Sequence, residues 1–448
     1  MKVRKRMEMM CSRAALPLLC VLMADCCLFG GGRLLSAGPV GFRMAVLFVF
    51  MLACFPSILR QRRALVRSGS LWSLLCFAAW LGVEAYLGAQ NGNRLSLILT
   101  DVKGFVYFAA VPALMAALED RARVHTLQKA MMYAAALLAA GEIALLGLYL
   151  ATPQSYLSLS EWLNARQVSM LGVITQRIPR LFMKSSMYLV CGCAFAVYFQ
   201  SREDRLRIRY LLVTGGCLFA LLLTYTRSIY LGALVTAAVL LVCVACAVDR
   251  AHRIRIAEHV GGGVAMLLAL VLIFSLAGHT NYMGYAFSRI STTFEQHDEE
   301  PPEPPTTPAS LEKQEQENYN ALTMNSDALR DQTLAELREN IRRSPVTGLG
   351  LGAAVAVRED GLNEYFYLDL LSKTGVIGLA LYLLPLLLMA IRLVQARKSE
   401  GFAQCAAWFS VLLGFLVFSY FNPYMNASLG ILMYGCCLAV FWCELKPV

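Results

Sequence analysis

The chain has 448 residues, of which 58% are hydrophobic and only 16% are charged, and its formal net charge is +10. Continuous apolar stretches of about 18 or more residues recur along it, which excludes a soluble domain and an outer-membrane barrel and predicts an all-α integral membrane protein. The basic residues cluster between the apolar stretches, where orientation signals occur, so nucleic acid is not an expected partner.

About twelve apolar segments are predicted to cross the membrane as helices. The first follows the basic opening MKVRKR and lacks a clear cleavage site of small residues, so it is predicted to remain as a span rather than to be removed as a signal peptide. The short loops after every second segment are rich in arginine and lysine, which predicts that both termini are cytoplasmic. The segments lie near residues 14–31, 43–59, 71–88, 104–118, 127–150, 184–200, 210–225, 228–248, 260–278, 376–392, 402–420 and 425–443.

The cysteines follow the apolar segments. All fifteen lie in or beside them, and none lies in the polar stretch between His279 and Gly361. The external loops are therefore expected to have no disulfide framework, and the thiols are expected to pack as small hydrophobic side chains. Cys243 and Cys246 have CxxC spacing, but they lie within a span without a second pair or a histidine, so a metal or redox role is not expected.

Two of the predicted outer loops are long, residues 151–183 and residues 279 to about 374. The second loop contains Glu299–Pro308, EEPPEPPTTP, whose prolines and like charges cannot bury a core. Its later part is predicted to be helical between residues 326 and 343, because leucine and isoleucine recur there at a spacing that forms one apolar face. Ser344-Pro345 is expected to end this helix.

The residues after this helix predict a tight turn and a second short helix. Gly348, Gly350 and Gly352 permit the turn. Residues 364–373 have an amphipathic pattern, and Gly375 separates them from the next span. The chain is thus divided into spans 1–9 (residues 1–278), a large, partly helical external loop with the site helices (279–375), and spans 10–12 (376–448).

Arginines occur on the predicted outer side, against the orientation rule. Arg227 lies in the short turn LLLTYTRSIYL between two spans, and Arg330 lies in the long loop. A charge at the membrane boundary is costly without a counter-charge, and a guanidinium binds phosphate through two parallel hydrogen bonds. The pattern predicts that these arginines hold an anionic, pyrophosphate-linked substrate. The alternatives are that Arg227 extends to lipid phosphate and that Arg330 lies on a solvated helix face.

Three motifs occur in a defined order. Thr224–Arg227 reads TYTR at the outer end of a span, and residues 367–378 read YLDLLSKTGVIG at the start of the tenth span. Between them, an arginine is followed four residues later by a bulky residue and then by a Pro-x-x-Gly-x-Gly turn; the residues are Arg330, Leu334, Ile341, Pro345, Gly348 and Gly350. Together the motifs resemble the TxSR, arginine–glycine-turn and YLxxLxxTGxxG elements of the O-antigen ligase and O-antigen polymerase superfamily. The resemblance covers residues 210–393.

One position differs from the ligases of that superfamily. They commonly carry His-Asn three residues before the Tyr-Leu pair, whereas this chain has Glu364-Tyr365. Polymerases vary more at this site, so the difference favours a polymerase, with ligase-type transfer to a lipid, wall or protein acceptor as the alternative. A polysaccharide flippase or transporter is the second alternative. It is expected to show charged residues along the middle of its spans and repeat symmetry, whereas this chain concentrates its unusual charges at the outer rim and in one large loop, and no convincing internal repeat is evident.

The resemblance implies a GT-C-like, metal-independent membrane glycosyltransferase of the bacterial cytoplasmic membrane, without a cofactor. Its donor would be a glycan on polyprenyl pyrophosphate and its acceptor another glycan or a lipid-linked acceptor, with membrane lipids around it and a flippase and a chain-length regulator as further partners. Arg227 and Arg330 would bind the pyrophosphate. Glu364 would orient or deprotonate the acceptor hydroxyl, unless it only favours the start of its helix. The other expected substrate-binding residues are Arg177, Arg180, Lys184 and Tyr367.

Overall fold

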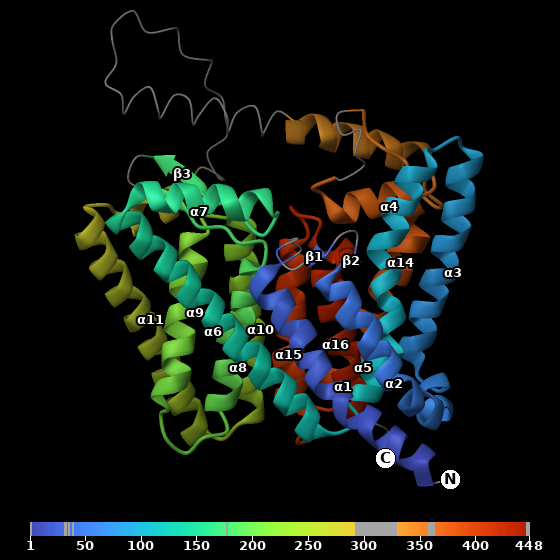
Figure 1. The fold of residues 1–448 in the computed structure, drawn as a ribbon, viewed down its shortest axis with the longest axis horizontal. Helices are drawn as coiled ribbons and strands as arrows, with labels where there is room; N and C mark the ends of the chain where they lie inside the picture. Colours follow the sequence, from blue (N-terminus) through green and yellow to red (C-terminus); the bar gives the residue numbers. More distant parts are fainter. Residues whose placement is uncertain are drawn as a thin grey trace, which may run out of the picture.

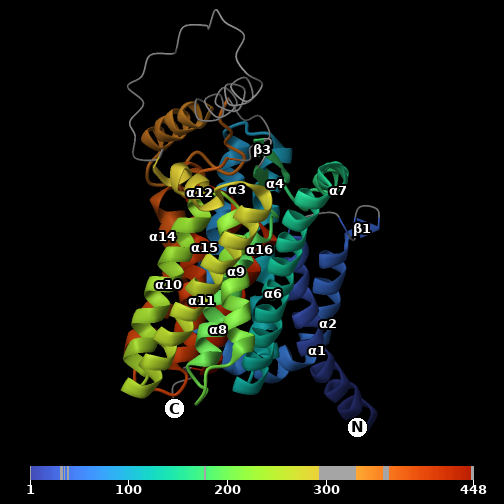
Figure 2. The ribbon, with the colours of Figure 1, turned by 90° about the vertical axis from the view of Figure 1, so that its left-hand side faces the viewer.

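The computed structural model describes residues 2–30, 34, 36–37, 40–175, 178–291, 329–356 and 363–444. These residues form a bundle of helices in which both chain termini lie at the same end (Figures 1 and 2). The opposite end carries α7, the β3–β4 hairpin and a helix over residues 329–343 (Figure 1). Arg177 and the Glu299–Pro308 segment lie outside the described residues.

Helices make up most of the described chain, which confirms the all-α prediction. The described residues also form two short antiparallel hairpins. In the first, β1 (Ser36–Ala37) pairs with β2 (Val40–Gly41), and in the second, β3 (Gly172–Thr175) pairs with β4 (Ile178–Arg180). The α-helices are α1 (Lys2–Phe29), α2 (Phe42–Val66), α3 (Gly69–Gln90), α4 (Leu95–Phe105), α5 (Val111–Ala117), α6 (Arg121–Ala151), α7 (Pro153–Ala165), α8 (Leu189–Gln200), α9 (Ile208–Leu223), α10 (Arg227–Ala247), α11 (Arg250–Gly278), α12 (Tyr282–Ser291), α14 (Phe366–Gln395), α15 (Phe402–Phe418) and α16 (Ser428–Glu444). The short 3₁₀ helices are η1 (Val106–Ala110), η2 (Ser186–Tyr188) and η3 (Tyr424–Asn426).

Among the described residues, seven helices are long and apolar enough to cross a membrane. They are α2, α3, the continuous α4–η1–α5 segment, α6, α10, α11 and α14, and four shorter apolar helices accompany them. Each predicted span falls on one of the helices of the bundle, but several helices begin earlier than their apolar core. Helices α6 and α11 start at basic residues because Asp120 and Asp249 accept hydrogen bonds from the first-turn N–H groups of Arg123 (2.9 Å) and His252 (3.0 Å).

The interior of the bundle is formed by α5, α8, α15 and α16, which are buried along most of their length. Helices α10 and α15 approach each other closely at Gly232 and Gly414, as small residues permit. A side chain at Gly232 would collide with Phe418, and one at Gly414 would collide with Thr236. Eight of the fourteen described cysteines are buried free thiols, as expected, but Cys246 lies on the exposed face of α10.

Residues 344–352, here called the glycine turn, dock against a break in α14. The break lies at Gly375, whose φ of +64° only glycine adopts at little cost. The first part of α14 ends with the carbonyl groups of Ser372 and Lys373, which accept hydrogen bonds from the N–H groups of Leu349 (2.9 Å) and Gly350 (3.0 Å). The predicted turn and the predicted separation at Gly375 are therefore parts of one interlocked structure.

The other side of the glycine turn rests on α3. The N–H of Leu351 donates to the carbonyl of Glu84 at 2.9 Å, and a Cβ atom at Gly88 would lie 2.1 Å from the carbonyl oxygen of Leu351. Gly88 thus has no room for a side chain. The glycine turn is thus held between the end of α3 and the break in α14. Because it directly follows the helix at residues 329–343, these contacts hold that helix against the bundle.

Replacing Gly88 by alanine is expected to lower the stability of the protein by about 2 kcal/mol or more, because the new methyl group forces the glycine turn away. The matched control is Gly82→Ala in the same helix, where a Cβ atom would meet nothing within 4 Å. This control is expected to be neutral or stabilising by up to about 1 kcal/mol. Thermal unfolding of the two variants in detergent measures the difference, and equal midpoints would contradict the close contact.

Candidate functional site

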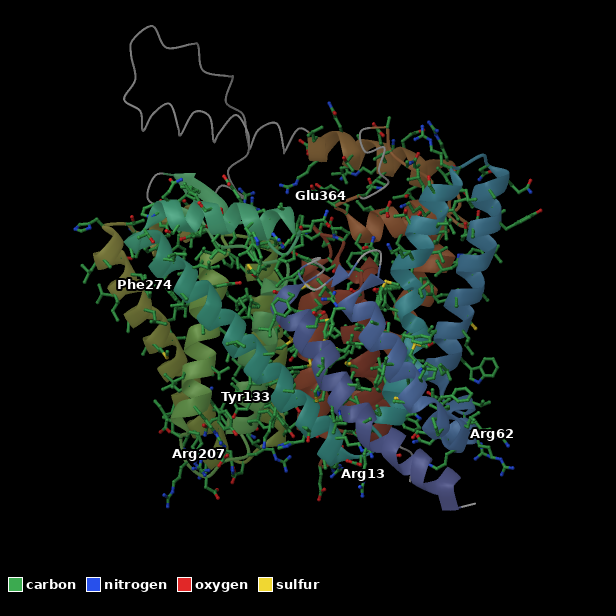
Figure 3. The ribbon with its side chains drawn as sticks, viewed as in Figure 1. Arg13, Arg62, Tyr133, Arg207, Phe274 and Glu364 are labelled. Atoms are coloured by element: carbon green, nitrogen blue, oxygen red, sulfur yellow. The ribbon has the colours of Figure 1, made fainter. Side chains whose placement is uncertain are left out.

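Arg330 and Glu364 form an ion pair at the end of the bundle opposite the termini. Nε of Arg330 lies 2.7 Å from Oε2 of Glu364, and their side chains are 45% and 27% exposed. Figure 3 shows Glu364 at this end, with Arg13, Arg62 and Arg207 at the other. The structure thus brings together two residues that were predicted separately and that lie 34 positions apart. The pair presents a cation and a carboxylate side by side at an accessible surface.

The residues on either side of Glu364 fix it in place. Asn363 is buried and donates a hydrogen bond to Oδ1 of Asp369 at 2.5 Å. On the other side, the ring of Tyr365 contacts Tyr420 and Phe421, with ring centres 6.4 and 6.5 Å apart. Burial raises the pKa of the Tyr365 hydroxyl, and the nearby Arg330 guanidinium opposes this shift. Glu364 therefore lies on a short segment that is anchored at both ends.

A cluster of three charged residues lies below this segment. Nζ of Lys373 is 2.9 Å from Oδ1 of Asp101 and 2.9 Å from Oδ2 of Asp369, and the lysine side chain is only 3% exposed. The remaining oxygen of Asp101 accepts a hydrogen bond from the N–H of Gly352 at 2.7 Å. This lysine–aspartate cluster ties α4, the glycine turn and the first part of α14 together. Removing one partner of such a buried pair typically costs about 3–5 kcal/mol.

The lysine–aspartate cluster borders a cavity of about 20 Å³, which has room for about one water molecule. Asn426 and Phe366 also line it. The sequence patterns did not single out Lys373 or Asp369. The available signal was a carboxylate and a lysine four residues apart in an otherwise apolar helix, which indicates an internal ion pair.

Arg227 is the first residue of α10 and is half-buried. The preceding Tyr225 has a φ of +49°, a left-handed conformation that costs a non-glycine residue about 1–2 kcal/mol. Its ring packs against Tyr285, with ring centres 4.9 Å apart. The next residue, Ser228, accepts a hydrogen bond from the amide of Asn422 at 3.0 Å. The TYTR motif therefore forms a strained turn whose helix start is held by the loop that contains Asn422.

Residues 419–427, here called the α15–α16 loop, join these parts of the site. Tyr420 and Phe421 contact Tyr365, Asn422 contacts Ser228, and Asn426 lines the cavity beside the lysine–aspartate cluster. The loop therefore connects the start of α10 to the segment that carries Glu364. Sequence reasoning treated it only as a short connection between two spans. Its signal was the polar and aromatic sequence SYFNPYMNA between apolar segments.

The remaining predicted substrate-binding residues are spread over this end of the molecule. Arg180 ends β4, is exposed, and lies 5.6 Å from the ring of Phe182. Burial raises the pKa of Tyr424 in the α15–α16 loop, and Arg180 is close enough to oppose that shift. Lys184 is half-buried between β4 and η2.

Tyr367 uses its hydroxyl inside the bundle. The hydroxyl donates to the carbonyl of Leu416 at 2.8 Å, which holds α14 against α15. This bond gives Tyr367 a structural role, and its predicted contact with substrate stays a prediction. In the part of the chain that the structure describes, no group of three histidine, cysteine, aspartate or glutamate side chains has the arrangement of a metal site.

No family model matches the sequence, and no curated protein matches it at a significant level. The long apolar helices define the class of protein, a membrane-embedded helical bundle. Within it, the Arg330–Glu364 pair, the lysine–aspartate cluster and the α15–α16 loop form one connected polar region at a single end of the bundle.

Proposed function

We propose that the protein is a GT-C-like membrane glycosyltransferase with twelve spans that polymerises polyprenyl-pyrophosphate-linked oligosaccharide repeat units. The observation that carries this proposal is the Arg330–Glu364 contact of 2.7 Å, in which a phosphate-binding side chain lies beside a proton-accepting one. The order of the motifs, which resembles that of the O-antigen polymerases, supports the same function. The reaction needs no metal, because the pyrophosphate of the donor is already an activated leaving group.

The charge distribution supports an outer location for the reaction. Arg13, Arg62 and Arg207 lie at the end of the bundle that carries both termini (Figure 3). Basic residues are concentrated in cytoplasmic loops, so this end is assigned to the cytoplasm and the Glu364 end to the outer face of the bacterial cytoplasmic membrane. Repeat units become available at that face once a flippase has carried them across the membrane.

In the proposed reaction, the acceptor hydroxyl attacks the anomeric carbon of the donor glycan. Its oxygen forms the new glycosidic bond, its proton passes to the carboxylate of Glu364, and the bond from the anomeric carbon to the pyrophosphate oxygen breaks. Arg330 and Arg227 stabilise the charge that develops on the departing polyprenyl pyrophosphate. One such preorganised contact typically lowers the barrier by about 2–4 kcal/mol.

The ion pair suggests how donor binding prepares the base. Without donor, the guanidinium of Arg330 is engaged with Glu364. The pyrophosphate group of the donor carries more negative charge than one carboxylate, and its oxygens match the two-pronged geometry of the guanidinium. The donor therefore draws Arg330 away from Glu364, which leaves the carboxylate free to accept the proton of the acceptor hydroxyl.

The proposal is tested with the purified full-length protein in detergent and lipid-linked oligosaccharide extracted from cells that carry the gene. A polymerase is expected to give a ladder of longer lipid-linked products and to release polyprenyl pyrophosphate. A ligase would require a different added acceptor. A flippase forms and breaks no covalent bond, and a detergent micelle gives it no second membrane face, so it would leave the substrate unchanged. That result would overturn the proposal.

A further inference from the structure

A second polar site lies at the end of the bundle that carries both termini, away from the Arg330–Glu364 pair. It is a cavity of about 740 Å³, within the usual size range of small-molecule sites. Four parts of the chain form it: the start of α6, the end of α8 with the turn that follows, the start of α15 and the end of α16. Polar residues four positions apart on these helices face the same space.

The two carboxylates of this cavity share one arginine. Arg121 lies 2.7 Å from Glu400 and 2.8 Å from Glu444, and the Glu444 side chain is completely buried. Both negative charges are thus engaged by Arg121. The two ion pairs link the start of α6 to the segment before α15 and to the end of α16.

A second guanidinium, that of Arg202, also lines the cavity. Arg202 lies 6.0 Å from the ring centre of Tyr198 and 3.5 Å from its hydroxyl, and it is exposed. Within the described parts of the chain, no carboxylate forms an ion pair with Arg202, although Glu444 is near enough to sense its charge. His125 also lines the cavity, and Lys129 and Arg202 both act on it electrostatically.

Behind the cavity is a buried amide with unused hydrogen-bonding capacity. Gln404 lines the cavity and donates a hydrogen bond to Oε1 of Gln128 at 3.2 Å. Gln128 is completely buried, and its own Nε2 has no hydrogen-bond partner among the described residues. Gln128 does not line the cavity itself, so the Gln404 amide connects the cavity to a polar group in the interior of the bundle.

We propose that this cavity binds the phosphate group of an anionic ligand through Arg202, with His125 and Thr126 beside it. Arg121 and Arg202 are the two guanidinium groups that line the cavity. Arg121 is engaged by both lining carboxylates, whereas Arg202 forms no ion pair among the described residues and offers the geometry that phosphate prefers. The phosphate belongs either to a free phosphorylated molecule or to a phospholipid headgroup. The site is separate from the proposed catalytic residues, so its occupancy does not depend on the glycosyltransferase proposal.

The test follows alkylation of a cysteine placed in the cavity, using the full-length Thr126→Cys protein in detergent and inorganic phosphate as the probe. Thr126 lines the cavity and is exposed, so bound phosphate should slow its modification. Adding Arg202→Gln is expected to raise the phosphate concentration for half-protection about tenfold. Adding Arg207→Gln is the matched control: Arg207 lies at the same end, is paired with Glu203 and does not line the cavity.

A second arm identifies the source of the phosphate. Thr126→Cys protein in phosphatidylglycerol vesicles without added phosphate is compared with the same protein in detergent. Protection that appears only in the vesicles and is lost with Arg202→Gln supports the lipid headgroup. Protection by phosphate in detergent, lost with Arg202→Gln, supports a free molecule. No protection in either arm, or equal protection with Arg202→Gln, would overturn the proposal.

Discussion

Replacing Arg330 by lysine is expected to reduce polymer formation by about 100- to 1000-fold, because lysine keeps the charge but loses the two-pronged contact with pyrophosphate. Lysine can still form an ion pair with Glu364, so the fold around the site should be retained. Polymer formed per unit of purified protein, with lipid-linked oligosaccharide as donor, measures the effect. Arg227→Lys is expected to act in the same direction, because Arg227 is assigned to the same leaving group.

The matched control for this result is Arg343→Lys. Arg343 lies in the same helix as Arg330, is well exposed, and pairs with Glu339 one turn away at 3.3 Å. An exposed ion pair of this kind contributes little, so the control should retain nearly full activity. If both Arg330→Lys and Arg227→Lys gave near-normal product, the two arginines would be left with a solvated or lipid-facing role, and the leaving-group assignment would be wrong.

Much of the fold follows from local patterns in the sequence. Continuous apolar segments predicted the helices, and Gly348 and Gly350 predicted the turn. The spacing of leucine and isoleucine predicted a helix between residues 326 and 343, which the structure describes over residues 329–343. Each of these depends on residues that are close together in the chain. Helix ends were less well predicted, since hydropathy marks the apolar core of a helix, whereas its start depends on capping residues such as Asp120 and Asp249.

The composition of the site could be predicted only in part. Sequence motifs indicated Arg330 and Glu364 separately, but their contact depends on the glycine turn binding to the break in α14, which no local pattern encodes. The lysine–aspartate cluster has the same origin, because Asp101 reaches Lys373 from a helix that is distant in sequence. The α15–α16 loop was missed because a short polar loop between two spans is ordinary until its neighbours are known.

Tyr367 makes a structural contact that its motif did not predict. The tyrosine stands in the YLxxLxxTGxxG pattern and was therefore expected to bind substrate. Its hydroxyl donates to the carbonyl of Leu416, and Gly375 of the same pattern forms the helix break, while substrate binding by Tyr367 stays a prediction. Tyr367 and Gly375 of this motif thus help to build the scaffold that holds Glu364.

Replacing Glu364 by glutamine is expected to lower the turnover number by about 100-fold or more, because glutamine keeps the shape but cannot accept the proton of the attacking hydroxyl. Glutamine also cannot form the ion pair with Arg330, so it no longer competes with the donor pyrophosphate. The KM for the donor should therefore stay the same or fall while kcat falls. This separation of kcat from KM is the signature of a residue that acts on the acceptor and not on the donor.

Two further variants complete this test. Glu339→Gln, which removes an exposed carboxylate at the same end of the molecule, should leave both kinetic constants unchanged. Glu364→Ala separates the remaining roles, because a residue that only orients the acceptor tolerates glutamine better than alanine, whereas a general base tolerates neither. If Glu364→Ala kept full activity, the carboxylate would serve only as the resting partner of Arg330. The acceptor would then have to be activated by another group at this end of the bundle.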